Sequence, residues 1–198
     1  MDNSIAIFAA ALGIAAPWKV TGVEFNQEKR ELYLRLDCSA GEKFPCPDGS
    51  GLAGRYDSRE RTWRHLNFWQ HKTFITADIP RVRCADGSIQ MIDVPWAKKG
   101  SGFIVMFEAA VLLLMREMPV AAVAQMVDEH DTRLWRLLHR YVDAWKPCID
   151  MSKTTAICVD ETASKRGHTY ITLVIDAATK RLIFATEGRD KSTASALC

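Results

Sequence analysis

The sequence predicts an α+β protein, because strand-type and helix-type patterns occupy separate stretches of the chain. Alternating apolar residues broken by turn-forming residues fill the first hundred positions, which predicts a small β-rich domain. Residues 103–145 carry apolar side chains at helical spacing, and short apolar runs return from residue 154. We therefore expect a β-rich domain with a short N-terminal helix at 1–100, a helical segment at 101–148, and the start of another β-containing domain at 154–198.

Composition is that of a globular protein, with 48% hydrophobic and 25% charged residues among 198. The net charge of +2 is too small to indicate nucleic-acid binding by itself, so the positions of the basic residues must decide. Six scattered cysteines favour a reduced, cytoplasmic protein. The apolar stretch 5–16 lacks a basic start, so we interpret it as a core helix and not a signal peptide, and no run is long enough to span a bilayer.

Within the first domain, residues 20–36 predict a hairpin, since apolar residues alternate on both sides of a polar stretch. Residues 38–54 are rich in Gly, Pro, Ser and Asp and are predicted to form a loop. Strands are expected at 73–79 and 89–94, with Pro80 ending the first and a turn at 85–88 preceding the second.

Residues 55–66 interleave basic and aromatic side chains and include Arg59, Arg61 and Arg64. Such a segment is suited to following a DNA phosphate backbone, with aromatic rings available for stacking. It is equally suited to pairing and stacking on the surface of its own domain, because two acidic residues lie within it. Both interpretations stay open on the sequence alone.

Residues 119–145 have the pattern of a helix-turn-helix. Pro119 suits the first turn of a helix, residues 128–130 form a break, and Asp131 or Thr132 can cap a second helix that runs to about Trp145. One face of the second helix is apolar, and another is basic. The apolar face comprises Leu134, Leu137, Leu138, Tyr141 and Trp145, and the basic face comprises Arg133, Arg136 and Arg140.

An arginine stripe opposite an apolar face is what a recognition helix needs, because it neutralises phosphates and can read guanine edges of double-stranded DNA. The alternative is a helical hairpin whose arginines merely solvate a surface. Acidic residues at 128, 129 and 131 weigh slightly against DNA binding.

Cys46 and Cys84 each stand in a turn-like setting of the kind that supplies zinc ligands in pairs. Each turn has one cysteine, whereas a structural zinc site needs four ligands. The missing ligands would have to be His65, His71 or Cys38, and none stands at a recognisable spacing. We therefore expect no bound zinc.

Residues 156–159 form a continuous apolar run, which predicts a strand buried on both faces and ending at Asp160. A carboxylate at a strand end is rigidly held and suited to binding Mg²⁺, although such an acid is more often a turn residue or cap. A polar basic turn at 162–168 and two further strands, at 170–175 and 181–186, follow. Three antiparallel strands with the acid on the first are the opening of a ribonuclease-H-like fold.

The order and the residue sequences of several segments resemble those of transposases of the ISL-three insertion-sequence family. The matching segments cover nearly the whole chain, and together they are specific, although each alone is weak. They are residues 44–47 (FPCP), 62–66 (TWRHL), 80–84 (PRVRC), 94–97 (VPWA), 102–103 (GF), 116–124 (REMPVAAVA), 160–162 (DET), 165–168 (KRGH) and 185–190 (ATEGRD).

The resemblance implies a zinc-ribbon-like domain, a helix-turn-helix and a DDE catalytic domain that cuts and joins DNA strands. In such enzymes three carboxylates bind two Mg²⁺ ions, and Asp160 falls on the first of the three. Asp176 and Asp190 are too near it to be the second, which in the family lies downstream, as does the final glutamate. Two departures matter: Gly49 stands where the family has a second cysteine, and no histidine follows Cys84. The zinc site therefore looks eroded.

Three hypotheses follow. The first is a transposase polypeptide in truncated form, whose complete version cuts and joins DNA and which lacks catalysis by itself, because one carboxylate cannot assemble a two-metal site. The second is a DNA-binding module that recognises insertion-sequence terminal repeats and acts as an inhibitor or partner of full-length transposase, with homo-oligomers as a further possibility. The third is a decayed, inactive product.

Overall fold

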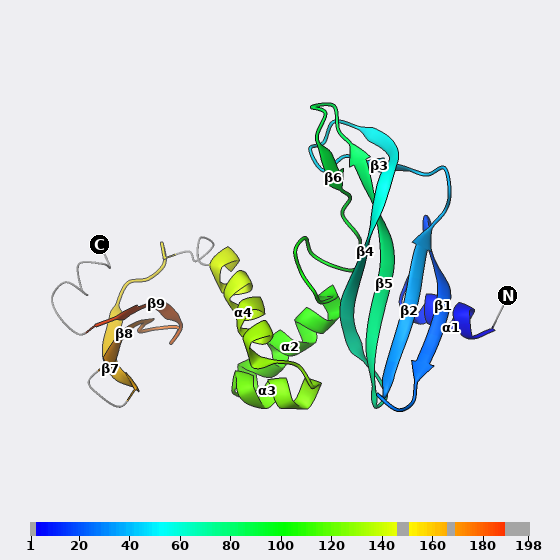
Figure 1. Ribbon diagram of the computed structural model, residues 1–198. Coiled ribbons are helices and arrows are strands. Elements are labelled where there is room, and N and C mark those ends of the chain that lie inside the picture. Colours follow the sequence, from blue (N-terminus) through cyan, green and yellow to red (C-terminus); the bar gives the residue numbers. More distant parts are fainter. Residues whose placement is uncertain (1–2, 146–150, 166–168, 189–198) are drawn as a thin grey trace. The chain divides into compact units, whose positions relative to one another are not determined.

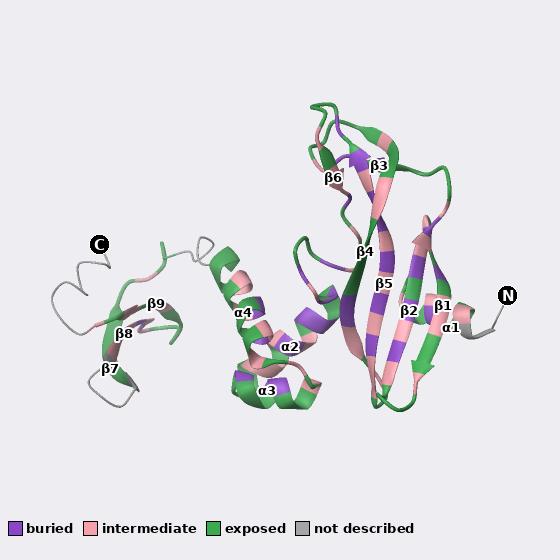
Figure 2. Ribbon diagram, viewed as in Figure 1, coloured by how far each residue is buried: buried purple, intermediate pink, exposed green. Residues whose placement is uncertain are grey.

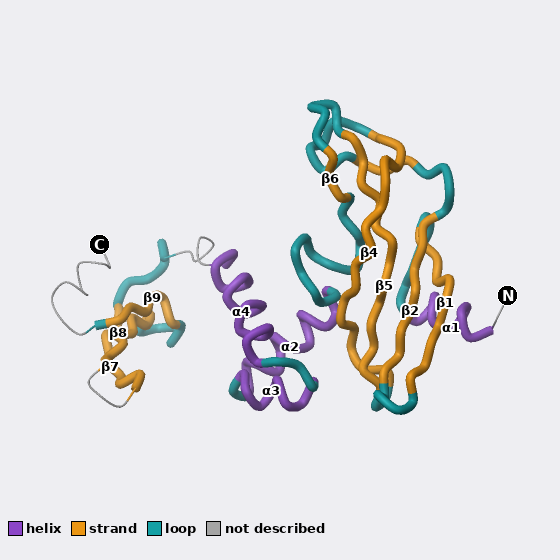
Figure 3. Tube along the Cα trace, viewed as in Figure 1, coloured by secondary structure: helices purple, strands orange, loops and turns teal. Residues whose placement is uncertain are grey.

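The computed structural model describes residues 3–145, 151–165 and 169–188 (Figure 1). The chain forms two compact units, Met1–Leu137 and Leu138–Cys198, and the boundary between them falls within helix α4. Each unit contains one sheet. The described residues thus confirm the predicted mixture of helices and strands, in largely separate stretches (Figure 3).

The first unit is built on a six-stranded sheet with the order β1-β2-β5-β4-β3, in which β6 pairs with β5. The predicted hairpin is confirmed as β1 (Trp18–Asn26) and β2 (Glu31–Cys38). Strand β2 pairs in parallel with β5, and the other pairs are antiparallel. The remaining strands are β3 (Lys43–Pro45), β4 (Leu52–Phe68), β5 (His71–Arg83) and β6 (Ile89–Met91).

Strand β4 is the main element that the sequence pattern did not predict. Its charged residues obscure the two-residue period, because this strand is half exposed and the apolar partners lie on β5. The loop predicted at 38–54 is also interrupted, by β3 and by the start of β4. Strand β6 ends at Met91, earlier than the predicted residue 94.

Pro80 does not end its strand, contrary to prediction, since β5 continues to Arg83. The ladder between β2 and β5 stops at Ala77, and the ladder between β6 and β5 begins at Arg81. Pro80 therefore lies in the gap between two neighbours on that side of β5, where a missing N–H costs no ladder hydrogen bond.

One face of this sheet forms the core, with Leu32, Leu34, Ile75 and Ala77 at most 1% exposed (Figure 2). Helix α1 (Asn3–Ala11) packs against β1, and its Phe8 ring lies against Phe68. The helix ends before the predicted residue 16. It ends because Gly13 adopts a positive φ of 62° and the N–H groups of residues 13 and 14 bond back to the carbonyls of residues 10 and 9.

Three helices follow the sheet: α2 (Val105–Glu117), α3 (Val120–Val127) and α4 (Asp131–Trp145). The predicted helix, break and helix at 119–145 are confirmed. The predicted cap of α4 is wrong: the Nδ1 atom of His130 accepts from the backbone N–H of Thr132 at 3.3 Å, so His130 occupies the position assigned to Asp131 or Thr132. The predicted apolar face is buried at Leu134 and Leu137, whereas Trp145 is exposed.

The second unit contains the antiparallel sheet β7 (Ile157–Lys165), β8 (Thr169–Asp176) and β9 (Leu182–Glu187). The three predicted strands are confirmed, but β7 runs beyond Asp160, so the carboxylate lies within the strand and not at its end. The prediction that this strand is buried on both faces is wrong: Ile157 and Val159 are exposed, and β7 lies at the edge of its sheet. Asp190 and Cys198 lie outside the described residues.

Among the described residues, no helix is long and apolar enough to cross a membrane.

Candidate functional site

Arg64 joins the helices to the sheet of the first unit. Its backbone N–H donates to the Gly102 carbonyl at 2.9 Å, and its carbonyl accepts from the Ile104 N–H at 3.1 Å, so residues 102–104 extend the edge of β4. The side chain is 1% exposed and its guanidinium lies 5.4 Å from the Phe107 ring centroid on α2. It also donates to the Val127 carbonyl at 3.2 Å, at the end of α3.

The turn between α3 and α4 docks on the same sheet through its acidic residues. The Glu129 carboxylate lies 3.3 Å from Nε of Arg64 and 2.6 Å from an amino nitrogen of Arg133. Asp128 adopts the left-handed conformation and pairs with Lys72 of β5 at 2.7 Å. Burial lowers the pKa of the Arg64 guanidinium, and the Glu129 charge opposes that shift. Two of the three acids that seemed to count against DNA binding, Asp128 and Glu129, are therefore used to position the helices.

The exposed face of α4 differs from the predicted arginine stripe. Arg133 is half-buried, since it pairs with Glu129 and lies 4.5 Å from the Phe103 ring centroid. Arg136 is exposed, and its Nε donates to the Thr132 carbonyl at 3.3 Å. Arg140 is half-buried beside the Tyr141 ring. Thr132 and His139 are exposed at helical spacing from Arg136, and Trp135 is exposed at helical spacing from both of them.

From the sequence, DNA contact was predicted for Arg136 alone among these residues, and Thr132 was named only as a possible helix cap. The available signal was the position of Leu134 and Leu137, because side chains on the opposite side of a helix from buried ones face solvent. We define the α4 surface as Thr132, Trp135, Arg136 and His139.

The arginines of residues 55–66 that were predicted as possible DNA contacts lie on β4 and fall into two groups. Arg59 and Arg61 are exposed, and Arg61 lies 6.0 Å from the Trp63 ring centroid. Arg64 is buried in its ion pair with Glu129, which removes it from the set of residues that can face DNA. Arg81, likewise, pairs with Asp57, which keeps the pKa of that carboxyl below its ordinary value. Ion pairs within the first unit therefore involve part of this segment, as its alternative interpretation predicted.

Two turns of the first unit have the same sequence pattern and the same conformation. They are residues 46–50 (CPDGS) and 84–88 (CADGS), in which Gly49 and Gly87 have φ values of 77° and 82°. In each turn the glycine N–H donates to the cysteine carbonyl, at 2.9 Å and 3.0 Å, and the aspartate accepts from the serine N–H, at 2.9 Å and 2.8 Å. The sequence analysis missed this internal repeat.

The turns bring Cys46, Asp48 and Cys84 together, with one potential ligand atom of each lying within 4.8 Å of the others. Both thiols are buried, and Asp48 is exposed. Burial, followed by contact with Cys46, raises the pKa of the Cys84 thiol, while hydrogen bonds from Ser50 lower the pKa of Asp48. His65, His71 and Cys38, which were considered as missing ligands, are not part of this cluster. Asp48 was overlooked because only cysteine and histidine were counted.

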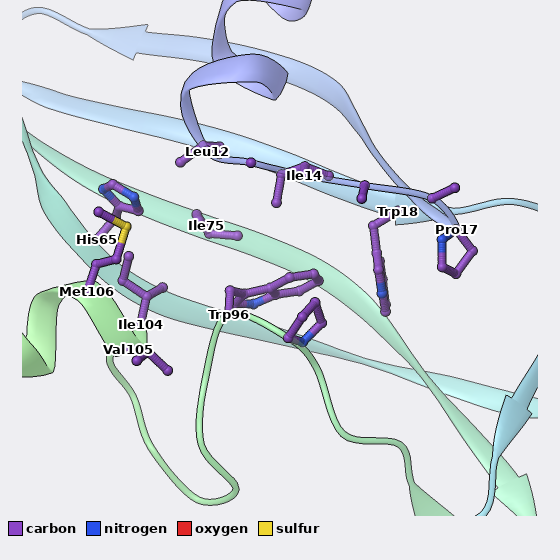
Figure 4. Close-up of a pocket in the computed structure, with 14 residues that line it drawn as sticks. Leu12, Ile14, Pro17, Trp18, His65, Ile75, Trp96, Ile104, Val105 and Met106 are labelled. Carbon is purple, nitrogen blue, oxygen red and sulfur yellow. The ribbon is translucent and has the colours of Figure 1, made fainter.

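An apolar pocket of about 550 Å³ lies between the connection from α1 to β1 and residues 95–106 (Figure 4). The Trp18 and Trp96 rings meet edge to face in its wall, with centroids 4.8 Å apart. His65 also lines it, and burial lowers the pKa of this imidazole. The pocket is a continuation of the core face of the sheet, since it reaches Ile75.

Asp160 is exposed on β7, and its Oδ1 atom accepts from the Glu161 N–H at 2.8 Å. It pairs with Leu173 across the sheet. Asp176 is instead a turn residue whose carboxylate accepts from the N–H groups of Ala178 and Thr179 at 2.9 Å and 2.7 Å. Among the described residues, Asp160 belongs to no cluster of three or more His, Cys, Asp or Glu ligand atoms.

Three family models match consecutive parts of the chain. A zinc-finger of transposase IS204/IS1001/IS1096/IS1165 matches residues 43–87, a helix-turn-helix domain of transposase family ISL3 matches residues 92–142, and a transposase domain of the same family, the DDE model, matches residues 157–198. The chain belongs to the ISL3 transposase family. The first model includes the turn at 46–50 and residues 84–87 of the second turn, the second includes the α4 surface, and the third includes Asp160.

Two curated relatives support the same family. They are the transposases for insertion sequence element IS1557 of Mycobacterium tuberculosis strains CDC 1551 / Oshkosh and ATCC 25618 / H37Rv, each 27% identical over 206 residues. The match covers 96% of this chain and 45% of each relative, so the chain spans about half the length of these curated transposases. No solved structure matches the chain.

Proposed function

We propose that this chain binds the terminal DNA of an insertion sequence through α3 and α4, with the α4 surface in the major groove. The observation that carries the proposal is the docking of Asp128 and Glu129 on the β-rich domain, through Lys72 and Arg64. This docking neutralises the acids of the turn and leaves the N-terminal half of α4 exposed. The N-terminal part of a recognition helix is the part that contacts base edges.

Each side chain of the α4 surface suits this role. Arg136 can donate to a phosphate or to a guanine edge, and Thr132 and His139 add donors and acceptors of shorter reach. Trp135 supplies an apolar face. Arg133 and Arg140, which are half-buried, are placed to contact the flanking phosphates, and exposed Arg59 and Arg61 offer further phosphate contacts from β4.

The experiment is a salt titration of DNA binding, followed by fluorescence anisotropy. The probe is a duplex from the terminal repeats of the element that encodes the chain, with scrambled duplex as competitor. Arg136→Ala is expected to weaken binding and to reduce the slope of log K against log salt by about 1, as loss of one phosphate contact does.

Lys29→Ala is the matched control, because it removes one positive charge from an exposed turn between β1 and β2. It is expected to leave the slope unchanged. Equal effects of Arg136→Ala and Lys29→Ala would mean that α4 is not the binding surface. Absence of any binding at low salt would end the proposal.

We propose further that Asp160 is the first metal-binding carboxylate of a strand-cleaving and strand-joining centre in the full-length protein. When bound, Mg²⁺ ions supply Lewis-acid activation of a water or a 3′-hydroxyl and stabilise the leaving oxygen. Asp160 is exposed and fixed within a paired strand, which fits the role of a single ligand. In the full-length protein, Asp160→Asn is expected to abolish strand cleavage and leave DNA binding intact. Cleavage at an unchanged rate would exclude Asp160.

A second candidate is DNA binding without strand transfer, by which this chain inhibits or partners a full-length transposase. The observation in its favour is that Asp160 belongs to no three-ligand cluster among the described residues. Cleavage of terminal-repeat DNA by the purified 198-residue chain with Mg²⁺ would exclude this candidate. Inhibition of full-length transposase by added wild-type chain, lost with Arg136→Ala, would support it.

A further inference from the structure

We propose that Cys46, Asp48 and Cys84 bind one thiophilic divalent ion, with Zn²⁺ the natural choice, through three protein ligands, and leave the fourth position to water. The site differs from the family's four-ligand pattern, because Gly49 replaces a cysteine and no histidine follows Cys84. Asp48 is the new ligand. This inference is independent of the proposed DNA binding, since it concerns other residues.

The donor set fits a zinc-like ion. Thiolate and carboxylate are both ordinary zinc ligands, and three protein ligands with one water make a complete tetrahedral shell. Ligand atoms around tetrahedral zinc lie about 3–4 Å apart, given bonds of 2.0–2.3 Å. The three candidate atoms already lie within 4.8 Å of one another, so a shift of about 1 Å completes the site.

The backbone supports the cluster from both sides. The Cys46 N–H donates to the Gly51 carbonyl and the Cys84 N–H donates to the Ser88 carbonyl, both at 2.8 Å, so each cysteine is fixed at the start of its turn. The Ala85 N–H lies 3.4 Å from the Ser50 hydroxyl and connects the two turns. These hydrogen bonds therefore position the two cysteines without the help of a bound metal.

The repeat supplies an internal comparison. Asp48 and Asp86 occupy the same position of the same turn, and each accepts a hydrogen bond from the serine two residues later. Among the described residues, the cluster includes Asp48 but not Asp86. Asparagine at either position keeps a side-chain oxygen that can accept the serine N–H, whereas only the change at Asp48 removes a carboxylate from the metal cluster.

The test is titration of the reduced, metal-free 198-residue chain with Co²⁺, followed by absorption spectroscopy. Co²⁺ substitutes for zinc and reports thiolate ligands through a sulfur-to-metal charge-transfer band. Wild type is expected to bind about one equivalent with this band present, and Zn²⁺ should displace the Co²⁺. Cys46→Ser and Cys84→Ser should each weaken the band. A wild-type chain that shows no charge-transfer band would overturn the proposal.

Asp48→Asn and Asp86→Asn decide the identity of the third ligand, even if the cysteine variants do not fold. Asp48→Asn is expected to weaken Co²⁺ binding at least about tenfold, whereas Asp86→Asn should bind like wild type. Equal affinities of the two variants would show that Asp48 is no ligand. Added imidazole should change the Co²⁺ spectrum of wild type by replacing the bound water. An unchanged spectrum would contradict the open fourth position.

Discussion

The two sheets of this protein differ in how they bury apolar side chains. In the first unit, Leu34 of β2 and Ile75 of β5 are each 1% exposed, whereas in the second unit Ile157 and Val159 of β7 are 47% and 60% exposed. The first sheet is covered by α1 and by residues 95–107, and its β4 and β5 are longer than any strand of the second sheet. Apolar alternation makes a strand, but a second layer is required to bury it.

The largest expected effect is on the ion pair that joins the helices to the first sheet. Arg64→Ala removes one of the two arginines that pair with the buried Glu129 carboxylate and empties a site that is 1% exposed, so we expect the free energy of unfolding to fall by about 3–5 kcal/mol. Urea unfolding monitored by tryptophan fluorescence measures this loss. All six tryptophans lie at or before residue 145, so the signal comes from the first sheet and the helices and not from the second sheet. Arg35→Ala, which breaks the exposed pairs with Glu60 and Asp78, should cost far less stability, because exposed ion pairs are screened by solvent. Similar losses for the two variants would show that the Arg64–Glu129 ion pair does not hold the helices to the first sheet.

A direct test of the comparison truncates one apolar side chain in each sheet. Leu34→Ala is expected to cost about 2–5 kcal/mol, because the site is fully packed. Val159→Ala should change stability by less than about 0.5 kcal/mol, since the side chain is already exposed. Fluorescence follows the first variant and far-ultraviolet circular dichroism the second. A large loss at Val159 would show that β7 is covered in solution.

The first unit should also depend on pH through His65. Burial lowers the pKa of this imidazole below its ordinary value of 6.5, so the unfolded chain binds protons more readily than the folded one. Stability is therefore full above about pH 6.5 and falls as the pH drops toward the lower folded pKa. Urea unfolding at several pH values measures the slope, and His65→Gln should flatten it. A wild-type slope of zero between pH 7 and 5 would be inconsistent with a buried neutral imidazole, by the same linkage.

A small effect is also expected at the outer ion pair of the helical turn. Lys72→Ala removes the partner of Asp128, whose side chain is 76% exposed, so the loss should be about 0.2–1 kcal/mol and should shrink as salt is added. The same urea titration, at low and high salt, checks this value. A loss as large as that of Arg64→Ala would mean that the two ion pairs, Lys72–Asp128 and Arg64–Glu129, depend on each other.

The local sequence pattern was sufficient to predict an element where that element depends only on its own residues. The hairpin, the helix-break-helix at 119–145 and the strands of the second sheet follow from periodicity and turn chemistry, which act over a few residues. Strand β4 did not follow, because its apolar partners lie on β5. The end of β7 was also misplaced, since ladder pairing with β8 continues past Asp160.

The candidate sites divide in the same way. The sequence alone identified the helix pair, Cys46, Cys84 and Asp160, because each belongs to a local motif. The roles of Arg64 and Glu129 could not be read locally: they are 65 positions apart, and only packing of α2 against β4 brings them together.

The sequence by itself determined the first hairpin, the helices at 119–145, the strands of the second sheet, the family and the residues that carry its motifs. Tertiary structure decided which charges face solvent and which face each other. It buried Arg64, directed the acids of the turn toward the sheet, exposed Arg136, and placed Asp48 beside two cysteines. The physical reason is that hydrogen-bonded turns and helices depend on neighbours in sequence, whereas burial and charge pairing depend on neighbours in space.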